Sequence, residues 1–116
     1  MSAPLRLENK DGVATITLAQ PENMNALSLV MLEALIGALD EVKRGDARVL
    51  VLAAEGRAFC AGADRAEMIE RKSADWEPIV DRYLDPVRQI AGLDIPVIAR
   101  LQGDTVGGGF GLAIAS

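Results

Sequence analysis

Two glycine-rich segments of the chain have residue types and spacing that could do chemistry. The first, 59–64, directly follows an apolar stretch, and its small side chains would let a ligand approach the backbone N–H groups closely. The second, 103–111, also follows an apolar stretch and opens a predicted helix. The first turn of a helix has free N–H donors and the positive end of the helix dipole. Such a terminus can bind a phosphate or stabilise an oxyanion, although a single glycine cluster is more often a tight turn.

The glycine spacing does not match the common nucleotide-binding motifs. A dinucleotide-binding GxGxxG motif that starts at Gly107 would need glycine at position 112, where the chain has Leu112. A P-loop that starts at Gly103 would need lysine at position 109, where the chain has Gly109. The sequence therefore disfavours both modes of nucleotide binding.

Few side chains near these segments could act as a nucleophile or an acid. Because the chain contains no histidine to activate Cys60, we interpret this cysteine as a small buried residue. Asp64 is equally compatible with the first turn of a helix and with contact to a ligand. Glu67 and Glu70 are predicted to lie on a solvated helix face. Backbone N–H groups are therefore the main candidates for chemistry here.

Composition excludes several classes of function. The 116 residues carry a net charge of −5, which counts against binding to nucleic acids. The absence of histidine removes Ser-His-Asp and Cys-His catalysis as well as zinc–histidine sites, unless another chain supplies the residue, so we expect no metal site. One cysteine cannot build an internal disulfide framework, and no apolar run is long enough to span a membrane. We therefore expect a cytoplasmic protein without a signal peptide.

The elements that would position the two segments indicate an α/β layered fold. Alternation over 5–10 and 13–18, separated by an Asp-Gly turn, predicts a β-hairpin. Ser28 is the predicted N-cap of an amphipathic helix that ends before Gly45. The continuous apolar run 49–52 is typical of a strand that is covered on both faces.

The second half of the chain continues this alternation of helices and strands. A short helix is predicted at 65–72, followed by a longer one at 76–90 that Pro86 should kink or interrupt. A strand at 97–101 leads through a loop at 103–108 into a last helix. That helix reaches the end of the chain with no capping glycine or basic last turn, so we expect a truncated domain.

Taken together, these segments resemble the crotonase family, the enoyl-CoA hydratase/isomerase superfamily. The matching pieces, in chain order, are 11–18, Pro21 with 25–28, 49–52, 59–64, 96–99, Gly103 and 107–109. No single piece is specific, but their order and spacing cover nearly the whole chain. The resemblance implies a crotonase-like α/β spiral of repeated ββα units, with residues 1–116 as the truncated N-terminal portion of a single domain.

The same resemblance implies an enzyme that acts on an acyl-CoA thioester. In the family, two backbone N–H groups hold the thioester oxygen as it becomes an enolate, and they correspond here to Ala63 and Gly108. The implied substrate-binding residues are Met24, Ala26, Ala61, Asp64, Arg65 and Gly107. No cofactor is implied, because coenzyme A is part of the substrate. Full-length members are commonly trimers or pairs of trimers, so we expect a homo-oligomer.

Three departures from the family pattern bear on the reaction. Hydratases of the family place a glutamate two residues after the triple glycine, where this chain has Gly111, and the second family carboxylate would lie beyond Ser116. The loop before Asn25 often carries basic residues for the CoA phosphates, but here it carries Glu22. Two functions stay open: an acyl-CoA enzyme of hydratase or isomerase type, and a non-catalytic fragment or subunit that keeps at most acyl-CoA binding.

Overall fold

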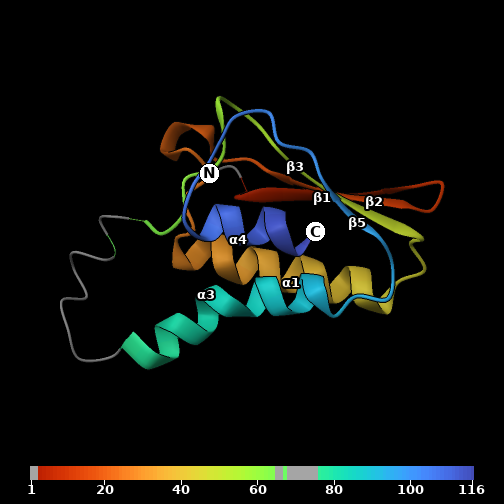
Figure 1. Ribbon diagram of the computed structural model, residues 1–116. Coiled ribbons are helices and arrows are strands. Elements are labelled where there is room, and N and C mark those ends of the chain that lie inside the picture. Colours follow the sequence, from red (N-terminus) through yellow and green to blue (C-terminus); the bar gives the residue numbers. More distant parts are fainter. Residues whose placement is uncertain (1–2, 65–66, 68–75) are drawn as a thin grey trace.

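The fold is a layered α/β arrangement, seen in a computed structural model that describes residues 3–64, 67 and 76–116. The elements are β1 (Leu5–Lys10), β2 (Val13–Leu18), the 3₁₀ helix η1 (Pro21–Asn23), α1 (Leu29–Arg44), β3 (Val49–Ala54), β4 (Ala58–Cys60), α3 (Trp76–Ala91), β5 (Val97–Ala99), β6 (Asp104–Thr105) and α4 (Gly108–Ala115). A four-stranded sheet in the order β1-β2-β3-β5 forms one layer, and α1, α3 and α4 lie on one of its faces (Figure 1). No helix in the described ranges is long and apolar enough to cross a membrane.

The predicted hairpin is present, since β1 and β2 pair in antiparallel register along their whole length. Asp11 and Gly12 form the turn with positive φ angles of 53° and 82°, as the favoured two-residue hairpin turn requires. The backbone N–H of Arg48 donates to Gly12 O at 2.7 Å, and its Nη2 donates to Asp11 O at 3.1 Å. These two bonds tie the tip of the hairpin to the start of β3, which pairs in parallel with β2.

Helix α1 begins and ends where the sequence predicts. Ser28 Oγ accepts a hydrogen bond from the Met31 N–H at 3.1 Å, which is the N-cap interaction. At the other end the Gly45 N–H donates to Glu41 O at 3.0 Å, and the helix stops at Arg44. The buried stripe of the helix consists of Met31, Leu32, Leu35, Ala38, Leu39 and Val42.

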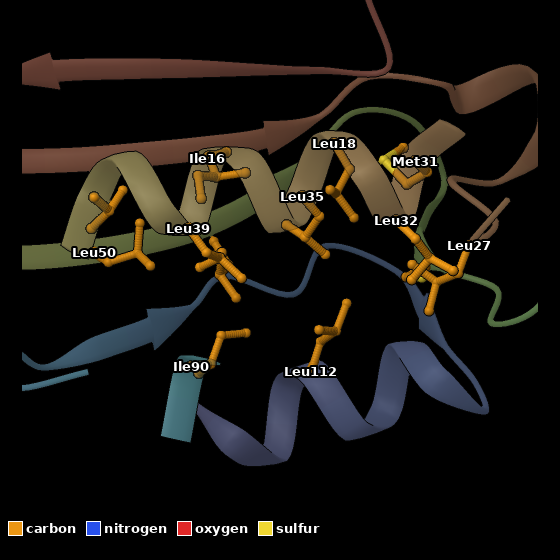
Figure 2. Close-up of a cluster of buried hydrophobic side chains, with 14 of the residues drawn as sticks. Ile16, Leu18, Leu27, Met31, Leu32, Leu35, Leu39, Leu50, Ile90 and Leu112 are labelled. Atoms are coloured by element: carbon orange, nitrogen blue, oxygen red, sulfur yellow. The ribbon is translucent and has the colours of Figure 1, made fainter. Parts of the chain in front are cut away.

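The hydrophobic core lies between the sheet and the helices. Ile16 of β2 and Leu50 of β3 are fully buried against Leu39 of α1 (Figure 2). Ile90 of α3 and Leu112 of α4 belong to the same cluster and lie at its lower edge in Figure 2. All three helices therefore bury their apolar faces in one shared core.

Strand β3 is fully covered on one face only, which differs from the expectation of a strand covered on both faces. Leu50 and Leu52 are buried toward the helices, whereas Val49 and Val51 are half-buried. On the neighbouring β5, Ile98 is 55% exposed on the same outer face as Val51. The continuous apolar run did not distinguish these faces, because valine fits both a covered and a half-covered position in a sheet.

Helix α3 runs through Pro86, so the interruption predicted at this residue is wrong. A proline inside a helix costs about 3 kcal/mol, because it removes one hydrogen bond and crowds the preceding turn. Pro86 is fully buried, and α3 packs against both α1 and α4. A surface ion pair between Arg82 Nη1 and Glu33 Oε1, 2.8 Å apart, also joins α3 to α1. Tertiary packing therefore offsets the local cost of the proline.

A second, smaller sheet lies outside what the sequence pattern predicts. β4 and β6 pair in parallel, with Ala58 opposite Asp104 and Cys60 opposite Thr105. β6 lies within the segment 103–108 that we expected to be a loop. Strands of three and two residues are too short to show the alternation that identifies a strand in a sequence.

The remaining expected elements are partly confirmed. The strand predicted at 97–101 is present but ends at Ala99. The last helix begins at Gly108, the second glycine of the run 107–109, as the sequence predicts. The short helix predicted at 65–72 lies outside the described residues, apart from Glu67.

Candidate active site

A pocket of about 510 Å³ opens where the first glycine-rich segment meets η1 and β6. Its lining consists of Asn23, Met24, Ala26, Ala58, Ala61, Ala63, Asp64, Asp104 and Val106. Five of the residues that the resemblance assigns to the site are therefore brought together: Met24, Ala26, Ala61, Ala63 and Asp64. Arg65, which the resemblance also assigns to substrate binding, lies outside the described residues.

Backbone hydrogen bonds hold the first segment against the residues that follow η1. The Ala61 N–H donates to Met24 O at 3.0 Å, and the Leu27 N–H donates to Gly62 O at 2.7 Å. Gly62 has a φ of +88°, a conformation that glycine adopts at little cost. Within the part of the chain that the structure describes, the Ala63 N–H donates to no protein acceptor. This donor is therefore available to a ligand in the pocket.

The second segment lies directly beside the first. The Val106 N–H donates to Cys60 O at 3.0 Å, and a Cβ atom at Gly107 would lie 3.7 Å from Gly62 Cα. Gly107 has a φ of +57° and precedes Gly108, the first residue of α4. The N–H groups in the first turn of a helix have no partner within the helix. Among the described lining residues Gly107 is absent, but it adjoins the loop that forms the lining.

Gly109 is required by close packing of α4 against β4. A Cβ atom at Gly109 would lie 2.6 Å from Cys60 Cβ and would overlap Cys60 O. We therefore expect Gly109→Ala to lower the free energy of unfolding by about 2 kcal/mol or more, because the clash involves backbone. Gly111→Ala, two residues further along the same helix, should instead raise it by about 0.5–1 kcal/mol, because alanine is the better helix former.

Urea unfolding of the two variants, followed by circular dichroism, tests this contrast. A Cβ atom at Gly111 would meet Val87 Cγ2 at 3.6 Å, an ordinary van der Waals distance. The same alanine substitution thus has opposite expected signs at two positions of one helix. Equal stabilities for the two variants would contradict the close approach of α4 to Cys60.

The Asn25 side chain holds the residues next to the pocket in place through hydrogen bonds. Its sequence context does not indicate this role. Its side chain is fully buried, and its φ of +54° is in the left-handed region. Nδ2 donates to Glu55 O at 2.9 Å and to Ala58 O at 3.1 Å, while Oδ1 accepts from the Gln20 N–H at 2.8 Å. Ala58 O accepts a further bond from Gln102 Nε2 at 3.0 Å. Asn25 therefore joins its own loop to the connection between β3 and β4, where Ala58 in turn bonds to Gln102.

Asp64 and Glu67 form a second connection between the first loop and helix α1. Asp64 Oδ1 accepts from the Glu67 N–H at 3.2 Å, as a first-turn helix residue would, and Asp64 also lines the pocket. Glu67 Oε1 accepts from the Leu29 N–H at 3.0 Å. Glu67 is thus a cap at the N-terminus of α1, where a carboxylate is favoured, and the prediction of a solvated face is wrong for this residue. Glu70 lies outside the described residues.

The charges and polar groups of the pocket limit its chemistry. Asp64 and Asp104 line it, and no cationic residue does so within the described ranges. Cys60 is fully buried beside it, and desolvation raises the pKa of the thiol, although a hydrogen bond with the Gly62 backbone lowers it in part. The thiol is therefore neutral near pH 7, which agrees with the interpretation of Cys60 as a core residue.

No carboxylate is supplied at the position where the family's hydratases carry one, because that position is Gly111 on α4. The described residues also contain no cluster of three or more acidic or sulfur side chains arranged to hold a metal ion. What the site does present is a set of fixed backbone N–H groups beside a mainly apolar pocket. Such an arrangement can bind a carbonyl oxygen and stabilise negative charge on it.

Comparison with known proteins identifies the family. The enoyl-CoA hydratase/isomerase family model matches residues 8–116. A relative from Rhodobacter capsulatus, a probable enoyl-CoA hydratase, is 38% identical over 113 residues, which are 97% of this chain and 43% of the relative. The 1,2-epoxyphenylacetyl-CoA isomerase of Escherichia coli is 38% identical over 108 residues, which are 89% of this chain and 41% of that protein.

Comparison of the fold with solved structures identifies the same family. The crystal structure of an enoyl-CoA hydratase from Mycobacterium smegmatis has a TM-score of 0.79 at 39% identity, over 86% of this chain and 40% of that one. The chain therefore spans less than half the length of each of these three relatives. Its ββα elements nevertheless match the crotonase fold in order and in space. The chain belongs to the enoyl-CoA hydratase/isomerase family.

Proposed function

We propose that the two glycine-rich segments form an oxyanion hole for an acyl-CoA thioester, with the backbone N–H groups of Ala63 and Gly108 as its donors. The observation that supports this proposal is the contact between the two segments. It consists of the Val106–Cys60 hydrogen bond and the close approach of Gly107 to Gly62. A free donor at Ala63 and a helix N-terminus at Gly108 then lie on adjoining loops. Both donors are fixed in place before a ligand arrives, which is the condition for electrostatic stabilisation of a developing charge.

The chemistry that such a site supports is enolate formation. The C–H bond next to the thioester carbonyl breaks, the proton goes to a base, and the electron pair moves onto the carbonyl oxygen. Each oxyanion-hole donor can contribute roughly 2.7–4 kcal/mol to such a step. Because Gly111 cannot exchange a proton, we propose isomerisation or another enolate reaction at least as readily as hydration.

The remaining site assignments are proposed on the same basis. Met24, Ala26, Ala61 and Asp64 line the pocket and would contact the substrate, and Gly107 would let it approach the start of α4. The reaction needs no cofactor besides the coenzyme A of its substrate. We also propose that residues 1–116 are the first part of a single domain. We propose further that the whole protein assembles into trimers or pairs of trimers.

Acetoacetyl-CoA is a probe for this oxyanion hole that needs no catalytic carboxylate. It enolises readily in buffer, with the C2 proton lost to solvent, and its enolate absorbs in the near ultraviolet. Titration with the 116-residue chain at constant pH should increase the enolate absorbance in a saturable manner. Free coenzyme A should compete for binding but give no such absorbance. Binding of acetoacetyl-CoA without any gain in enolate would contradict the proposed oxyanion hole.

A second candidate is a chain that binds acyl-CoA but does not turn it over. The observations that favour it are Gly111 in place of a glutamate and the match to less than half of each relative. Assay of the purified 116-residue chain with crotonyl-CoA distinguishes the two candidates. Turnover in the absence of any partner would contradict the non-catalytic alternative.

A further inference from the structure

The loop that contains Ala63 is attached to the start of α1 on both sides of this residue. Before Ala63 in the chain, Gly62 O accepts from the Leu27 N–H at 2.7 Å, and Leu27 and Ala63 form an isolated parallel bridge. After it, Glu67 Oε1 accepts from the N–H of Leu29, the first residue of α1, at 3.0 Å. The proposed donor therefore lies between two attachments to the same helix end.

A further hydrogen bond joins Glu67 to the loop itself. Asp64 Oδ1 accepts from the Glu67 N–H at 3.2 Å, so the residue directly after Ala63 bonds to the residue that bonds to α1. Helix α1 is a fixed point in the molecule, because its apolar stripe is buried in the hydrophobic core. Two consecutive hydrogen bonds thus lead from a core helix, through Glu67, to the peptide next to Ala63.

The bond to Leu29 requires a side chain of the right length that ends in an oxygen acceptor. A glutamine amide oxygen meets this requirement without a charge, because it accepts hydrogen bonds as a carboxylate oxygen does. An aspartate keeps the charge but is shorter by one C–C bond, roughly 1.5 Å. A negative charge near the site would by itself oppose enolate formation, because like charges repel. The length and the charge of Glu67 therefore have separable consequences.

We propose that Glu67 is a positioning residue of the oxyanion hole, which holds the Ala63 N–H toward the thioester oxygen through its bond to the Leu29 N–H. This inference rests on the proposed function, because it takes Ala63 as an oxyanion donor. Donors that are already oriented stabilise the developing charge without rearranging during the reaction. Glu67 acts through the loop and does not itself touch the substrate.

Two conservative variants of the 116-residue chain test the proposal. The measurements are the enolate absorbance of acetoacetyl-CoA at saturation and the Kd of free coenzyme A. Glu67→Gln keeps the bond to Leu29, so its enolate absorbance should be at least that of the unchanged chain. Glu67→Asp loses this bond, and its enolate absorbance should fall by about tenfold, because a small misplacement of a reacting group is costly. The Kd of free coenzyme A should stay the same in both variants.

Ser28→Ala is the matched control. It removes the other side-chain cap of α1, the bond from the Met31 N–H to Ser28 Oγ, and so weakens the same helix end. That hydroxyl bonds within its own helix, so the bonds of Leu27 and Leu29 to the loop stay in place. The enolate absorbance should be unchanged. A loss as large as that of Glu67→Asp would show that a weakened helix end, rather than the bond to Glu67, is responsible.

The possible results separate this inference from the proposed function. Full enolate absorbance in Glu67→Asp, or equal losses in Glu67→Gln and Glu67→Asp, would contradict the positioning role and leave the oxyanion hole standing. If the unchanged chain binds acetoacetyl-CoA without any gain in enolate, the oxyanion hole is wrong, and the positioning role falls with it.

Discussion

Replacing Gly108 with proline should reduce the enolate formed from bound acetoacetyl-CoA by about 100-fold or more. Proline has no N–H group, so Gly108→Pro removes one of the two proposed oxyanion donors. The loss of one such donor costs about 2.7–4 kcal/mol in the best-studied case. Helix α4 should persist, because Gly108 is its first residue and proline is favoured at the first position of a helix. The near-ultraviolet absorbance of the complex at saturation measures the effect.

Gly111→Ala provides the matched control for this substitution. It replaces another glycine of α4 but keeps every N–H group of the helix. The enolate absorbance of this variant should equal that of the unchanged chain. Circular dichroism of both variants establishes that the fold is retained. A folded Gly108→Pro chain with full enolate absorbance would show that the oxyanion donors lie elsewhere.

The second large effect is expected for Asn25→Ala, which should lower the free energy of unfolding by about 3–5 kcal/mol. The substitution leaves the Gln20 N–H and Glu55 O without the partners they have now, while Ala58 O keeps its bond from Gln102. Alanine also tolerates the left-handed backbone of this position less well than asparagine. A loss of this size is a large fraction of the stability of a small domain. Urea unfolding at equilibrium gives the comparison.

Asn23→Ala is the control, because it makes the same chemical change two residues earlier, at the end of η1. Asn23 Oδ1 is buried without a hydrogen-bond partner, so its removal leaves no other group unsatisfied. We expect a change of less than about 1 kcal/mol for this variant. Similar losses for Asn23→Ala and Asn25→Ala would show that the hydrogen bonds of Asn25 do not hold the loop together.

The elements that depend on local signals could be predicted from the sequence. The Asp-Gly turn specifies the hairpin because both of its residues adopt positive φ. Ser28, the apolar stripe and the glycine after Arg44 specify the limits of α1, since each acts within one turn of the helix. The two glycine-rich loops could also be located, because small residues after an apolar run are visible without any knowledge of what packs against them.

The features of the fold and the site that could not be predicted depend on contacts between residues far apart in the chain. Pro86 remains inside a helix because α1 and α4 pack against that helix, which a local rule cannot include. The carboxylate of Glu67 caps α1 from a different segment, and Asn25 bonds to a carbonyl of residue 55. The proposed oxyanion donors come from the resemblance to the family, whereas the geometry adds the contacts that bring their loops together.

The parallel pairing of β4 with β6 also has a consequence for the order of folding. It joins Ala58 to Asp104, so a long stretch of chain must be closed before the pairing can form, whereas the hairpin closes through a two-residue turn. Entropy of loop closure favours the local structure first. During synthesis the hairpin and α1 leave the ribosome well before β6 does. We therefore expect the pocket, which needs β6, to form after the hairpin and α1, and a nascent chain that stops before β6 to lack it.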